Sequence, residues 1–97
     1  MRTPFDITTM LIREGVAEGS LTGCLLFVQG YERQHENHRL TNQELCNAVI
    51  TPLVDIQAVC SPAAFATALG RAVAEKCFKA AYVGQLASTY DDSQWDR

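Results

Sequence analysis

Apolar residues recur at the helical spacing of about 3.6 residues along most of this chain, and no strand pattern competes with it. A first helix is predicted to begin after Thr3, whose side chain can cap it, with Pro4 at its first position. Its apolar stripe continues through Ile7, Met10 and Leu11. The pattern predicts an all-α protein, a compact bundle of four or five helices joined by short loops.

Gly15 and Gly19 weaken the helical pattern and predict a turn before a second helix, which begins at Ser20 or Leu21. The first half of this helix is apolar on nearly all sides, whereas a polar run extends from residue 32 to residue 39. We therefore expect the first half to be buried and the second half to be exposed to solvent.

The clearest helix start in the chain lies at Thr41 and Glu44. A threonine followed three residues later by a glutamate forms a capping box, in which each side chain accepts a hydrogen bond from the backbone N–H of the other residue. The helix that follows contains Pro52, which lacks a backbone donor and clashes with the preceding turn. A kink or an early stop is expected there.

A last helix is predicted from Ser61 and Pro62, a cap followed by a first-position proline, to about Leu86. Its many alanines make it slim, which favours a central position in the bundle. Residues 88–97 show little periodicity and are predicted to be an irregular C-terminal extension. Residues 1–87 then form a single helical domain.

Charge and composition exclude several classes of protein. The net charge of −3 includes no cluster of lysine and arginine that could follow a phosphate backbone, so nucleic acid is not expected as a partner. The longest apolar runs are far shorter than the ~20 residues that cross a bilayer. No apolar segment typical of a secretory signal follows Met1, so we expect a cytoplasmic protein unless a signal has been removed.

The chain has four cysteines, which suit either two disulfides or four small buried hydrophobic residues. The pairings considered are Cys46 with Cys60 and Cys24 with Cys77. Sequence spacing does not choose between paired and free thiols.

No arrangement of residues predicts catalysis. The chain has no glycine-rich phosphate loop, no Gly-x-Ser-x-Gly elbow and no pair of carboxylates placed as acid and base. His35 and His38 are three residues apart, whereas a helical zinc motif places its histidines four residues apart. We expect no enzymatic activity, no bound metal and no cofactor.

Polar and charged residues accumulate near the end of the second predicted helix, with aromatic residues beside them and in the C-terminal segment. Aromatic anchors within a polar rim are typical of protein interfaces. For the C-terminal segment, packing against its own domain is the alternative explanation. The residues predicted to bind a partner protein are Tyr31, Glu32, Arg33, His35, Glu36, His38, Arg39 and Trp95.

Three stretches of the chain share a pattern with one known family. Residues 24–30 resemble its Cys-x-x-aromatic-aliphatic-x-Gly element, and residues 41–53 resemble its Thr-x-x-Gln-Leu helix, with Glu44 in place of glutamine. Residues 62–77 resemble its Pro-Ala…Cys helix. The family is that of the small helical Rap/Tai-type immunity proteins, which bind and neutralise cell-wall amidase effectors of type VI secretion.

The resemblance implies a periplasmic inhibitor whose partner is a secreted amidase. The alternative is a cytoplasmic regulator or inhibitor, encoded by a mobile element, that acts on a host protein complex. Pairing with a second copy of the chain is a further open alternative.

Overall fold

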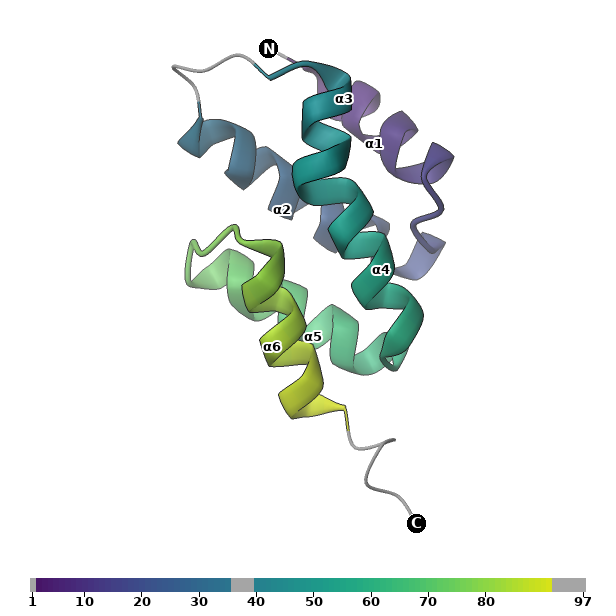
Figure 1. Ribbon diagram of the computed structural model, residues 1–97, viewed down its shortest axis with the longest axis vertical. Coiled ribbons are helices and arrows are strands. Elements are labelled where there is room, and N and C mark those ends of the chain that lie inside the picture. Colours follow the sequence, from purple (N-terminus) through teal and green to yellow (C-terminus); the bar gives the residue numbers. More distant parts are fainter. Residues whose placement is uncertain (1, 36–39, 92–97) are drawn as a thin grey trace.

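The computed structural model describes residues 2–35 and 40–91, which form an all-α bundle (Figure 1). The predicted fold class is therefore confirmed. A continuous helical run crosses the bundle and comprises a short helix, a π-helical turn and a longer helix. The helices are α1 (Pro4–Arg13), a 3-10 turn (Glu18–Ser20), α2 (Leu21–Gln34), α3 (Asn42–Leu45), the π-helical turn (Cys46–Ile50), α4 (Thr51–Val59), α5 (Pro62–Ala74) and α6 (Ala80–Tyr90).

Side-chain caps start the helices where the sequence predicts them. The Thr41 hydroxyl accepts a hydrogen bond from the Glu44 N–H at 3.1 Å, and the Glu44 carboxylate accepts one from the Thr41 N–H at 2.8 Å. Thr3 and Asp6 form the same box at the start of α1, and these hydrogen bonds from Thr3 hold the pKa of Asp6 below its ordinary value. Ser61 caps α5 through the Ala64 N–H.

Thr41→Ala should lower the free energy of unfolding by about 1 kcal/mol, because the Glu44 N–H then loses its capping partner. Urea denaturation followed by circular dichroism measures this change. Thr67→Ala is the matched control, since Thr67 lies inside α5, is exposed and bonds only to the carbonyl of Ala63. Equal losses in both variants would contradict the cap.

The first turn lies at Gly15, as predicted. Its φ of +99° is in the left-handed region that favours glycine. The Gly15 N–H donates to the carbonyl of Ile12 at 3.1 Å, and the Val16 N–H donates to the carbonyl of Leu11 at 3.0 Å. This pair of bonds is a Schellman motif, which satisfies the last carbonyls of α1.

The prediction of one helix from residue 62 to about residue 86 is wrong, because a second Schellman motif ends α5 at Ala74. The Lys76 N–H donates to the carbonyl of Val73 at 3.1 Å, and the Cys77 N–H donates to the carbonyl of Ala72 at 3.0 Å. Lys76 takes the position that glycine usually holds, with a φ of +56°. Without a glycine to mark the end, the apolar periodicity gives no sign of this break.

The helix that contains Pro52 does not stop there. The preceding turn instead widens to π-helical form, in which the Thr51 N–H donates to the carbonyl of Cys46, five residues earlier. The wider turn accommodates a proline that has no N–H to offer. The early stop is therefore absent, since α4 continues to Val59, and the irregularity near Pro52 is the π-helical turn that precedes it.

The predicted irregular extension from residue 88 is also corrected, because α6 continues to Tyr90. The next residue, Asp91, is 1% exposed, and its carboxylate accepts a hydrogen bond from the Ser61 N–H at 3.1 Å. This contact ties the end of α6 to the start of α5. Residues 92–97, with the predicted anchor Trp95, lie outside the described residues.

The core receives side chains from every helix. The slim α5 packs against α2, α4 and α6, while α1 packs against α2. Small residues of α5, such as Ala68 and Ala72, are fully buried at these contacts. The largest fully buried side chains include Ile7, Leu11, Phe27, Leu45, Ile50, Leu53, Phe65, Leu69 and Val83.

Candidate protein-binding surface

The predicted binding residues at the end of α2 separate into different roles. Tyr31 is half-buried and packs against the core, and its ring stacks on His35 with ring centroids 4.3 Å apart. Arg33 is exposed, and the described residues include no ion-pair partner for it. Glu36, His38 and Arg39 lie outside the described residues. The position of His38 relative to His35 is therefore not described either.

Glu32 has a structural role that the sequence did not predict. It forms an ion pair with Arg2, and the two side chains are only 14% and 16% exposed. Arg2 also donates to the carbonyl of Leu40 at 2.6 Å and to Asn42 Oδ1 at 2.7 Å. The guanidinium therefore joins the start of the chain to the end of α2 and the start of α3. Glu32 is neutralised within the fold rather than free on an interface rim.

Phe78, in the loop between α5 and α6, is the central residue that sequence reasoning missed. Its ring meets Phe27 edge to face, with centroids 5.6 Å apart and planes at 74°. The ring also lies directly over Gly30, where an added Cβ would be 2.1 Å from it. Because Gly30 has no side chain, the loop that carries Phe78 can pack directly against α2.

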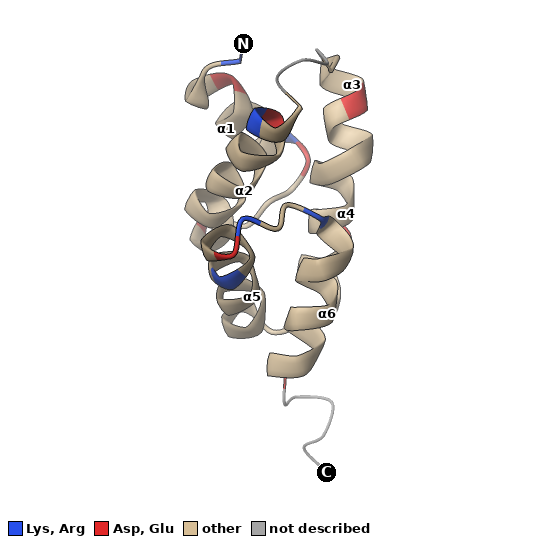
Figure 2. Ribbon diagram, turned by 90° about the vertical axis from the view of Figure 1, so that its left-hand side faces the viewer, with Lys and Arg blue, Asp and Glu red and all other residues tan. Residues whose placement is uncertain are grey.

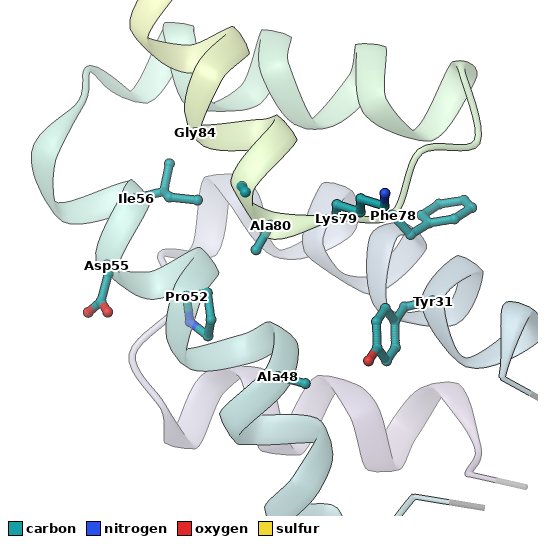
Figure 3. A pocket seen from close by; sticks show the side chains of 10 residues that line it. Tyr31, Ala48, Pro52, Asp55, Ile56, Phe78, Lys79, Ala80 and Gly84 are labelled. Atoms are coloured by element: carbon teal, nitrogen blue, oxygen red, sulfur yellow. The ribbon is translucent and has the colours of Figure 1, made fainter. Parts of the chain in front are cut away.

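A groove of about 650 Å³ opens beside Phe78, between the helical run that ends in α4 and the start of α6 (Figure 3). Figure 3 shows Ala48, Pro52 and Ile56 along one wall, Ala80 and Gly84 along the other, and Tyr31 at one end. The exposed lining is mostly apolar, and several of the residues are small. The full lining is Tyr31, Ala48, Pro52, Asp55, Ile56, Phe78, Lys79, Ala80, Ala81 and Gly84.

A smaller hollow of about 290 Å³ lies between α2 and the end of α5, and Phe78 also lines it. Its apolar part includes Leu26, which is 48% exposed, and its rim carries Arg33 and Lys76. We call the groove and the hollow together the Phe78 surface. The residues that line the hollow are Leu26, Gln29, Gly30, Arg33, Gln34, Val73, Lys76 and Phe78.

The Phe78 surface is positively charged although the chain carries a net charge of −3. Arg33, Lys76 and Lys79 are exposed around Phe78, and none has an ion-pair partner in the part of the chain that the structure describes. Lys76 and Lys79 belong to the segment between α5 and α6, where Figure 2 shows basic residues. The nearby Glu75 is occupied: hydrogen bonds from the Tyr82 hydroxyl and from Arg71 lower its pKa.

The cysteines are free thiols in the structure. Cys46 and Cys60 lie 14 positions apart on one helical run, so their separation is about 20 Å at 1.5 Å per residue. A disulfide requires Cα atoms within about 7 Å, so the Cys46–Cys60 pairing considered from the sequence cannot form in this fold. Cys24 and Cys77 are also unpaired. Burial raises the pKa of Cys24 to about 12, which keeps its thiol protonated and unreactive at neutral pH.

Residues 2–35 and 40–91 offer neither a metal site nor a membrane span. No group of three or more His, Cys, Asp and Glu side chains among them is placed to hold a metal ion. No helix formed by these residues combines the length and apolar character needed to cross a bilayer.

Comparison with protein-family models, with curated proteins and with solved structures gives no match to this chain. The resemblance to the immunity proteins therefore stays a prediction that rests on the motifs alone.

Proposed function

We propose that this chain is a non-catalytic binding protein that inhibits a partner protein by docking onto it through the Phe78 surface. The observation that carries the proposal is the coincidence of an open apolar groove, an exposed Leu26 and three cations around one anchored aromatic residue. None of these cations has an ion-pair partner among the described residues. Exposed apolar area with a charged rim is the composition of protein interfaces.

The packing of Phe78 supports the same proposal. Phe78 is held by Phe27 and by close approach to Gly30, so the loop that carries it does not have to be ordered when a partner binds. A preformed surface loses less conformational entropy on association and gains affinity accordingly. Tyr31 and Arg33, two of the residues predicted from the sequence, belong to this surface.

The resemblance implies one version of this function, in which the partner is a secreted cell-wall amidase. The free thiols favour the other version, a cytoplasmic regulator of a host protein complex, because disulfides are typical of oxidising compartments and the Cys46–Cys60 pairing is impossible in this fold. Both versions share the binding surface and differ in the identity of the partner.

Capture of the partner from the native host tests the proposal. The immobilised full chain should retain one protein saturably, and that protein, identified by mass spectrometry, should lose its own activity when the chain is added in equimolar amount. Arg33→Glu should weaken the complex about tenfold, because it reverses a charge on the rim of the surface.

Arg13→Glu is the matched control for that variant, since Arg13 is exposed at the end of α1 and lines neither the groove nor the hollow. Its dissociation constant should equal that of the unmodified chain. A partner that keeps full activity in the complex, or no saturable partner at all, would overturn the proposed function.

A further inference from the structure

From the chemistry of the Phe78 surface, we infer that the partner presents an acidic amphipathic helix. Its apolar side chains enter the groove between α4 and α6, and its carboxylates meet Arg33, Lys76 and Lys79. This inference rests on the proposed function and adds to it the chemical character of the segment that is bound.

The shape of the groove fits a helix. Its walls are two helices, and small residues at Ala48, Ala80 and Gly84 leave space between them for large apolar side chains. The wall from Ala48 to Ile56 is about 12 Å long at 1.5 Å per residue, which matches about two turns of a bound helix. Recognition of this kind places apolar anchors at positions i, i+4 and i+7 of the partner helix.

The charge of the partner follows from the cations around Phe78. Among the described residues, two carboxylates on the neighbouring segments are already engaged: Glu32 pairs with Arg2, and Glu75 pairs with Arg71 and accepts from the Tyr82 hydroxyl. Since no other described residue forms an ion pair with Arg33 or the two lysines, they can meet carboxylates of a partner. Charge-assisted hydrogen bonds at such a rim orient the complex and speed its formation.

Asp55 decides which way the acidic side of the helix faces. It lines the groove on the α4 wall, is exposed, and has no ion-pair partner among the described residues. A carboxylate of the partner placed against Asp55 would be repelled. The acidic side of the bound helix must face the α5–α6 loop and α2, and its opposite side, toward α4, must be neutral or basic.

Carbodiimide cross-linking of the captured complex tests this chemistry, because the reagent joins a lysine amine to a carboxylate in direct contact. Mass spectrometry of the cross-linked peptides should show Lys76 and Lys79 joined to aspartate or glutamate of one partner segment. Apolar residues should recur at helical spacing in that segment. The double variant Lys76→Glu, Lys79→Glu should raise the dissociation constant at least tenfold.

Filling the groove tests the apolar part separately. At Gly84 an added Cβ meets Ile56 at 3.6 Å, an ordinary contact, so Gly84→Leu should fold, place its side chain in the groove and weaken the complex at least tenfold. Gly70→Leu is the matched control, because Gly70 is exposed on α5 with nothing within 4 Å. Thermal midpoints show whether each variant folds; if Gly84→Leu does not, the double lysine variant decides.

The inference fails alone if the partner is bound and inhibited but the double lysine variant retains full affinity. It also fails alone if the partner is inhibited but no cross-link joins Lys76 or Lys79 to a carboxylate of the partner. If the captured molecule is a nucleic acid or a second copy of this chain, the proposed function fails as well. If no saturable partner exists, or if the partner is not inhibited, the proposed function fails and the inference fails with it.

Discussion

Phe27→Ala should lower the free energy of unfolding by about 3–5 kcal/mol, a large part of the stability of a domain of this size. Phe27 lies on α2 and is fully buried, and its ring packs edge to face against the ring of Phe78, with the two centroids 5.6 Å apart. Alanine leaves a cavity in the core and removes the edge-to-face contact. Urea denaturation, with the midpoint and slope both fitted, measures the loss.

Phe5→Ala removes the same atoms from the surface and is the control. Phe5 lies on α1 with 77% of its area exposed, so its replacement should change stability by no more than about 0.5 kcal/mol. Similar losses at both positions would show that Phe27 is not the buried support of the loop.

Gly30→Ala should destabilise the protein by about 1–2 kcal/mol, although alanine is the better helix former by about 1 kcal/mol. The added methyl group would lie 2.1 Å from the Phe78 ring, so the ring or the loop must move. Overpacking of this kind costs more than the gain in helix propensity. Calorimetric thermal midpoints give the sign directly.

Gly70→Ala makes the same change where nothing lies within 4 Å, so only the gain in helix propensity remains. Its midpoint should rise while that of Gly30→Ala falls. A rise in both variants would place the Phe78 ring away from Gly30 and would remove the anchor of the binding surface.

Local signals in the sequence predict the starts of α1, α3 and α5 well, although not that of α6. Thr3, Thr41 and Ser61 all cap helices where their neighbours indicate, because a cap depends on residues within one turn of it. Gly15 marks the end of α1 for the same reason. Such signals operate over three or four residues, so no tertiary contact is needed to read them.

The remaining features depend on contacts between distant residues. From the sequence alone, Glu32 is expected to be a free surface charge. In the fold, Arg2, which lies 30 positions earlier in the chain, binds its carboxylate. From the sequence alone, Phe78 is expected to be one more apolar residue of a long helix. In the fold, the helix ends before Lys76, and Phe78 lies in a loop with its ring over Gly30. The predicted surface therefore included Tyr31 and Arg33 but not the groove or the two lysines.

The left-handed conformation of Lys76 bears on any attempt to engineer this protein. The left-handed conformation costs a residue with a Cβ about 1–2 kcal/mol, whereas glycine adopts it without strain. A redesign guided by stability alone would therefore place glycine at position 76. That choice would delete one of the cations beside Phe78. The resulting protein would melt at a higher temperature while its recognition surface was poorer, so a screen by melting temperature would select against the function proposed for that surface.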